Sequence, residues 1–179
     1  MSIVEFIKFE GITPKLMNLL NYDKLICRIN QQDKVISLLQ KLDWSLPEDE
    51  QESAMIIIMD MFDAEDYGLL IIAGNKNTWF NAVRILKAIG YPKNKNALPS
   101  LTLLLQDLSW PGAEDSMYVL KEAGKEALIP LLEIVIESAA DSSDFIWLAG
   151  MKQFVAFAQL KKSDFFNQNI YDLLQYAEW

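Results

Sequence analysis

Acidic side chains are the groups in this chain whose number and spacing suggest chemistry. The sequence has 25 Asp and Glu among 179 residues, but one cysteine and no histidine. Paired carboxylates can act as general acid and base in a hydrolase, and clustered carboxylates can bind hard cations. Two clusters qualify, and their members are Glu48, Asp49, Glu50 and Glu52, followed by Asp63, Glu65 and Asp66.

The two acidic clusters also have simpler interpretations. Runs of charge are most often solvated turns and helix starts. Ser45–Gln51 reads as a turn that feeds acids into the first turn of a helix, where the helix dipole favours them. A protein-binding face is the next interpretation, and a catalytic or metal-binding role is the least expected of the three.

The other reactive groups form no recognisable active site. Cys27 lies in an apolar run with Leu25, Ile26 and Ile29, which predicts a buried, reduced thiol. No serine stands in a Gly-x-Ser-x-Gly sequence, the 7 glycines form no phosphate-binding loop, and the absence of histidine excludes a Cys/His zinc site. We therefore expect a protein that is not an enzyme and uses no cofactor or metal.

The net charge of −9 is concentrated in one segment. Leu42–Asn75 contains nine acids and no Lys or Arg, which leaves 16 acids (25 − 9) against 16 basic residues elsewhere. A nucleic-acid-binding protein needs clustered Lys and Arg, so this balance argues against a nucleic-acid partner. We expect a protein partner with a basic surface, and we predict that Glu48–Asp66 forms or borders the face that binds it.

The sequence gives no indication of a membrane partner. No apolar run reaches the roughly 18 to 20 residues that span a bilayer, and Met1–Glu10 lacks the pattern of a signal peptide. We expect a cytoplasmic protein. The sequence leaves the partner's identity and the oligomeric state open.

The stretch Ala97–Pro130 indicates how the elements of this chain are built. Leucines at helical spacing predict a first helix, and they are Leu98, Leu101, Leu104, Leu105 and Leu108. A corner ending at Trp110 follows, Pro111 suits the first turn of a second helix, and Gly124 suits its end. A third helix is expected from about Leu128. Trp110 is expected to fix the corner by burying its ring, with contact to a partner as the second interpretation.

Similar sequences recur along the chain. AVRILKAIG at 82–90 resembles SMYVLKEAG at 116–124, an offset of 34, and LLQKLDW at 38–44 resembles LLQDLSW at 104–110, an offset of 66. Trp44, Trp79, Trp110 and Trp147 fall 35, 31 and 37 residues apart, as expected if each marks a similar corner. Periods of about 30 to 50 residues are typical of helical repeats, so we predict an all-α, HEAT-like α-solenoid of antiparallel helix pairs.

We expect one helical-repeat domain over residues 1–179. It would comprise divergent N-terminal helices in 1–75, the clearest repeats in 76–160 and a C-terminal capping helix in 161–179. The apolar run in Glu52–Met61 predicts a helix buried on nearly every side, whereas Met1–Glu10 suits a helix and a strand equally. The other predicted helix starts are Thr13, Tyr22, Gln32, Asp66, Asn77 or Thr78, Ser143 and Ser163.

One sequence motif resembles a known family. The matching residues are Gln106, Asp107, Leu108, Trp110 and Pro111. With them, Ala97–Gly124 resembles an uncharacterised bacterial family of HEAT-like helical repeats whose hallmark is Leu-Gln-Asp-Leu-Asn-Trp-Pro, although Ser109 stands in place of the asparagine. The resemblance extends from about Thr78 to Phe154. That family has no established catalytic residues, its type of fold usually serves as a binding surface, and its relatives are suspected to include immunity proteins for bacterial toxins.

The function we expect is a non-catalytic protein-protein interaction module of immunity or regulatory type. One alternative is a HEAT-like nucleic-acid-associated protein, because related architectures include DNA glycosylases. It would require a basic concave surface. The other alternative is a carboxylate hydrolase, which would require two acids in one pocket with raised pKa values.

Overall fold

The computed structural model of the chain describes residues 9, 11–30 and 33–177. Within these residues it contains eleven α-helices, four short 3₁₀ helices and no strand, so the all-α prediction is confirmed. The interpretation of Met1–Glu10 as helix or strand lies outside the described residues, apart from Phe9, which is buried. No helix of the described part is both long and apolar enough to cross a bilayer.

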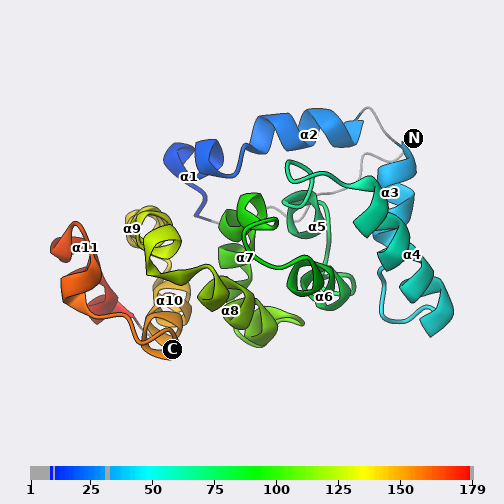
Figure 1. Cartoon of the computed structure of the whole chain (residues 1–179). Helices are drawn as coiled ribbons and strands as arrows, with labels where there is room; N and C mark the ends of the chain where they lie inside the picture. Colours follow the sequence, from blue (N-terminus) through cyan, green and yellow to red (C-terminus); the bar gives the residue numbers. More distant parts are fainter. Residues whose placement is uncertain (1–8, 10, 31–32, 178–179) are drawn as a thin grey trace.

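The chain runs from α1 near α9 to α3 and α4 at the opposite end, and then returns through the later helices. Their bounds are α1 (Pro14–Leu19), α2 (Tyr22–Asn30), α3 (Asp33–Gln40), α4 (Glu48–Met61), α5 (Leu69–Ile72), α6 (Trp79–Ile89), α7 (Leu98–Leu103), α8 (Ala113–Glu122), α9 (Gly124–Asp141), α10 (Phe145–Phe157) and α11 (Gln168–Leu173). The 3₁₀ helices are η1 (Lys95–Ala97), η2 (Leu104–Gln106), η3 (Lys162–Asp164) and η4 (Leu174–Tyr176). Figure 1 shows α3 and α4 at one end, α5 to α8 in the middle and α9 to α11 at the other end.

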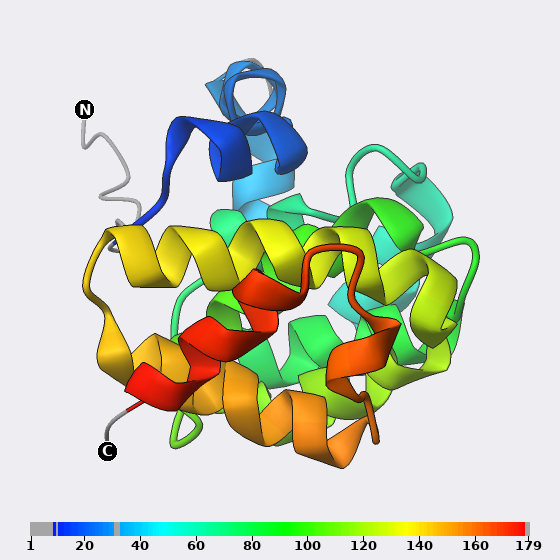
Figure 2. The same cartoon turned by 90° about the vertical axis from the view of Figure 1, so that its left-hand side faces the viewer.

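Many packing contacts join helices that are adjacent or one helix apart in this order. α4 packs against α3 and α6, α6 packs against α5 and α8, and α9 packs against α8 and α10. α1 is different, because it packs against α9, which is more than a hundred residues further along the chain. The Oγ1 atom of Thr13 lies 2.6 Å from the Oγ atom of Ser138, and Figure 2 shows α1 lying along α9.

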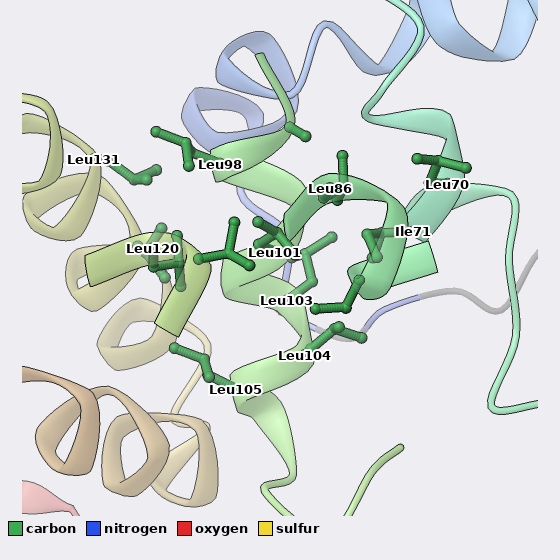
Figure 3. Close-up of a cluster of buried hydrophobic side chains, with 14 of the residues drawn as sticks. Leu70, Ile71, Leu86, Leu98, Leu101, Leu103, Leu104, Leu105, Leu120 and Leu131 are labelled. Atoms are coloured by element: carbon green, nitrogen blue, oxygen red, sulfur yellow. The ribbon is translucent and has the colours of Figure 1, made fainter. Parts of the chain in front are cut away.

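A single hydrophobic core runs through the described residues from Phe9 to Leu174. The leucines of α7 and η2 lie at its centre, and Leu101, Leu103, Leu104 and Leu105 are all fully buried. Figure 3 shows them among leucine and isoleucine side chains of the neighbouring helices. The predicted apolar face of this segment is therefore confirmed at its central positions.

Several helix starts agree with their sequence signals. The Thr13 hydroxyl accepts a hydrogen bond from the Leu16 N–H at 3.4 Å, and Pro14 occupies the first position of α1. α2 begins at Tyr22, and α6 begins directly after Thr78. Gly124 has a φ of 77°, the left-handed conformation expected at a helix end.

The start of α8 differs from the prediction. Pro111 lies in the turn before the helix, and α8 begins at Ala113. The turn needs Gly112, whose φ is 86° and whose added Cβ would lie 3.0 Å from the carbonyl oxygen of Trp79. The corner therefore closes through a left-handed glycine packed against α6 rather than through the proline.

Other predicted boundaries were wrong by several residues. α9 begins at Gly124 rather than near Leu128, and it continues past Pro130. α10 is capped by Asp144 rather than Ser143, because the Asp144 carboxylate accepts a hydrogen bond from the Trp147 N–H at 2.8 Å. The helix starts predicted at Asp66 and Ser163 were also wrong, since α5 begins at Leu69 and α11 begins at Gln168, after the Asn167 cap.

The four tryptophans do not mark equivalent corners. Trp79 and Trp147 lie at the starts of helices and are fully buried. Trp44 and Trp110 lie in turns, where Trp110 is half-buried and Trp44 is 58% exposed. The similar spacing of the tryptophans in the sequence therefore corresponds to two different environments, which depend on the packing around each ring.

Cys27 also departs from its predicted environment. The thiol is exposed, although it lies among apolar residues in the sequence. α2 is one-sided: Leu25 faces the core, Ile26 is half-buried, and Cys27 lies on the outer surface.

Candidate functional site

α4 presents the first acidic cluster on the surface of the molecule. The helix begins at Glu48, four residues earlier than predicted, so that Glu48, Asp49 and Glu50 occupy its first turn. These three side chains and that of Glu52 are exposed. Acids in a first helical turn face the positive end of the helix dipole, which explains why they are tolerated together there.

Buried polar contacts fix the start of α4. The Asn81 Nδ2 atom donates hydrogen bonds to the Leu42 carbonyl oxygen at 2.9 Å and to the Gln51 Oε1 atom at 2.6 Å. Gln51 in turn donates to the Leu46 carbonyl oxygen at 2.6 Å. Because Asn81 belongs to α6 and is fully buried, these bonds hold the acidic end of α4 at a defined position on the core.

The second acidic cluster divides into exposed and buried members. Asp63 and Glu65 are exposed in the turn after α4, and Glu65 forms an ion pair with Lys24 of α2. Asp66 is only 4% exposed, and its Oδ2 atom accepts a hydrogen bond from the Asp63 N–H at 3.3 Å. Asp66 is therefore part of the internal structure of the turn, whereas the other predicted acids face solvent.

The prediction that the apolar run of α4 is buried on nearly every side was wrong. Ala54, Met55 and Ile58 are buried, but four large apolar side chains of the helix are exposed, namely Ile56 (64%), Ile57 (41%), Met59 (37%) and Met61 (41%). The physical reason is that α4 lies at the end of the helix array, where α3 and α6 cover one side of it (Figure 1).

We define the α4 face by its exposed residues. They are Glu48, Asp49, Glu50, Glu52, Ser53, Ile56, Ile57, Met59, Asp60 and Met61. The first half of this face is acidic and the second half is mainly apolar. The sequence did not predict that the apolar half is exposed. A helix at the end of a helix array can carry the same apolar run as a buried helix in the middle of the array.

Trp110 lies at a different corner from the acidic clusters. Its ring packs against Trp79 with 5.0 Å between ring centroids and against Phe9 at 6.2 Å. The Lys76 Nζ atom lies 5.1 Å from the centroid of the Trp110 ring. Through these contacts the half-buried Trp110 ring has a structural role, because it packs the corner against Trp79 and Phe9.

Two corners of the chain share one local geometry. The Ser109 hydroxyl donates to Asp107 Oδ1 at 2.6 Å and holds the pKa of that carboxyl below its ordinary value of 3.8, while the Ser109 N–H and the Lys76 charge lower it further. At the other corner the Ser45 hydroxyl donates to Asp43 at 2.7 Å, which lowers the pKa of Asp43 in the same way. Both carboxylates stabilise turns.

Two cavities in the described part of the chain each contain one carboxylate. A cavity of about 240 Å³ contains the Lys24–Glu65 pair, and another of about 400 Å³ between α10 and α11 contains Asp172, so each is lined by a single acid. Asp43, Asp107 and Asp164 have lowered pKa values, which is opposite to the shift of a general acid. In residues 9, 11–30 and 33–177, no three Cys, Asp or Glu side chains lie close enough to hold a metal ion.

No known protein family, curated protein or solved structure matches this chain. The resemblance to a family of HEAT-like repeats therefore stays a hypothesis based on residues 97–124. What the structure establishes is an all-helical protein with an acidic and apolar helix exposed at one end.

Proposed function

We propose that this protein is a non-catalytic protein-binding module and that its α4 face binds a partner with a basic surface. The observation that supports the proposal is the placement of charge. Glu48, Asp49, Glu50 and Glu52 are exposed together on one helix, and Leu42–Asn75 contains no Lys or Arg. Such a concentration of acids attracts a basic partner and raises the rate of association.

The arrangement of the helices is consistent with a short HEAT-like solenoid, which we include in the proposal. The Leu-Lys-x-x-Gly sequences of α6 and α8 share two features: Leu86 and Leu120 are fully buried, and Gly90 and Gly124 have φ values of 70° and 77°. The resemblance to bacterial HEAT-like repeats supports the same architecture. Proteins of this type commonly act as binding surfaces, so an immunity or regulatory role is the class of function we favour.

The test compares a charge-neutralised variant with a matched control. The variant carries Glu48→Gln, Asp49→Asn, Glu50→Gln and Glu52→Gln, and the control carries Glu114→Gln, Glu122→Gln, Glu126→Gln and Asp141→Asn, all of which are exposed elsewhere. Each variant has the same net charge. We expect the wild type and the control to capture the same basic protein from an extract of the source cells at low salt, and the α4 variant to lose it.

Kinetics with the purified partner complete this test. The α4 variant should associate at least tenfold more slowly than the control at low salt, and the difference should shrink as salt screens the charges. Equal association rates for the α4 variant and the control would contradict the proposal. Tight binding of duplex DNA with a steep salt dependence would instead favour the nucleic-acid alternative.

A further inference from the structure

We infer that the cavity between α10 and α11 is a binding site for a small organic anion, a molecule with an apolar body and one acidic group. The cavity has a volume of about 400 Å³, which is sufficient for a small ligand. It lies at the end of the molecule opposite α4 (Figure 1), so this inference does not depend on the proposed function of the α4 face.

The return of the C-terminal helices forms this cavity. α11 packs on α9 and η4 packs on α10, and Figure 2 shows these last helices, in red, lying across the two longer ones. The Asn167 N–H, just before α11, donates a hydrogen bond to the Glu133 carboxylate of α9 at 2.7 Å. Lys125 of α9 pairs with Asp164 of η3 at 2.9 Å. The wall of the cavity is therefore held in place by contacts that need no ligand.

Apolar side chains make up one part of the cavity lining. Val155 of α10, Leu160 of the following turn and Leu174 of η4 all line it and belong to the hydrophobic core. The Tyr171 ring also lines it and packs edge-on against Phe165, with 5.3 Å between ring centroids. An apolar ligand body placed against these side chains would remove apolar surface from water, which favours binding.

Hydrogen-bond donors make up the other part of the lining. Lys152, Tyr171 and Gln175 carry an ammonium, a hydroxyl and an amide group. Among the described residues, none of these three groups has a hydrogen-bond or ion-pair partner. The acid of the lining, Asp172, accepts hydrogen bonds from Lys162 Nζ at 2.7 and 2.6 Å. Its charge is compensated, so the charge of Lys152 is the one left for a ligand.

The chemistry of the lining selects among classes of ligand. Lys152 repels a cation, and a neutral apolar molecule leaves the charge of Lys152 unused. A carboxylate or sulfonate accepts hydrogen bonds from all three donor types, and such bonds are strongest when both partners are charged. An apolar molecule with one acidic group therefore complements both parts of the cavity.

The probes are two fluorescent dyes that share one ring system. Anilinonaphthalene sulfonate carries one negative charge, and N-phenylnaphthylamine is its uncharged analogue. Both dyes become brighter when they leave water for an apolar site. We expect saturable, one-to-one binding of the anionic dye to the wild-type protein, measured by fluorescence titration at pH 7. Absence of such binding would overturn the inference.

The variant Lys152→Gln tests the role of charge. Its matched control is Lys41→Gln, which removes an exposed lysine from the turn after α3, far from the cavity. We expect Lys152→Gln to weaken binding of the anionic dye at least fivefold and to leave binding of the uncharged dye unchanged. The control should bind both dyes like the wild type. An equal effect of Lys152→Gln on the two dyes, or no effect on either, would show that the site does not select anions.

The variant Ala156→Phe tests the location of the site. Ala156 is exposed on α10 and lines the cavity, so a phenylalanine there should occupy the space of the ligand. We expect both dyes to bind this variant at least tenfold more weakly. Gln153→Phe is the control, because Gln153 is exposed on the same helix outside the lining. Circular dichroism should show both variants folded, and wild-type binding by Ala156→Phe would mean that the dyes bind elsewhere and that the inference is wrong.

Discussion

At the scale of single residues, the aspartates at the two similar corners have the clearest physical role. Asp43 and Asp107 each accept hydrogen bonds from the N–H and the hydroxyl of the serine two residues later. Each carboxylate therefore takes the place of water as the hydrogen-bond acceptor for these two donors of the turn. The same two hydrogen bonds occur in both turns, so the ends of the similar sequences 38–44 and 104–110 have the same local structure.

Substitution of Asp107 tests this role. Asp107→Ala removes both hydrogen bonds and should lower the free energy of unfolding at pH 7 by about 1 kcal/mol, measured by urea denaturation. Asp107→Asn retains an acceptor oxygen and serves as the control, with a smaller loss. No loss in the alanine variant would mean that water replaces the carboxylate without cost.

The pH dependence of stability follows from the lowered pKa values. Because the folded-state pKa values of Asp43 and Asp107 lie below the ordinary 3.8, their stabilising contribution is complete above that pH and is lost as pH falls through the folded values. The free energy of unfolding of the wild type should therefore fall below about pH 4. The double variant Asp43→Asn, Asp107→Asn should show a shallower fall over the same range.

At the scale of helices, α10 packs closely on η2. Gly150 of α10 lies against the backbone of Leu105, and an added Cβ would collide with the Leu105 carbonyl oxygen. Alanine normally favours a helix over glycine by about 1 kcal/mol, but forced displacement of packed backbone costs more. The glycine is therefore required for packing rather than for helix formation.

Gly150→Ala should destabilise the protein despite its better helix propensity. We expect a net loss of about 2 kcal/mol in the free energy of unfolding, measured by chemical denaturation. Ala156→Ser adds one atom to an exposed position of the same helix and should change stability by less than about 0.5 kcal/mol. A stabilising effect of Gly150→Ala would show that α10 can move away from η2 freely.

At the scale of the whole molecule, α1 connects two distant parts of the chain. Leu16 is fully buried, α1 packs on α9, and Lys15 pairs with Glu137 at 2.5 Å. In a regular solenoid each unit contacts its neighbours only. The contact of α1 with α9 is a long-range constraint, as is the packing of α10 on η2.

Leu16→Ala should destabilise α9 as well as α1. We expect a loss of about 2–5 kcal/mol, the range for removing a buried leucine side chain, together with faster amide hydrogen exchange in α9. Met17→Ala, at a position 41% exposed on the same helix, is the control and should leave exchange in α9 unchanged. Faster exchange confined to α1 would show that this contact contributes little to the rest of the fold.

The sequence by itself determined the helical class, the leucine face of α7 and the concentration of acids in Leu42–Asn75. These properties depend on local spacing and composition, which act before any tertiary contact forms. The predicted starts of α1, α2 and α6 are also observed. At α1, Thr13 and Pro14 act within one turn of the chain, whereas the Thr78 hydroxyl before α6 bonds to Asn75 and does not cap the helix.

The tertiary structure decided which side of each helix meets another element. The apolar run of α4 and the apolar neighbours of Cys27 gave no information on burial, because burial depends on what packs against a helix and not on its own pattern. Asp66 and Trp110 likewise acquired structural roles from a turn and from the rings of Trp79 and Phe9. The exposed face of α4 arises because it ends the helix array, a property of the assembled fold alone.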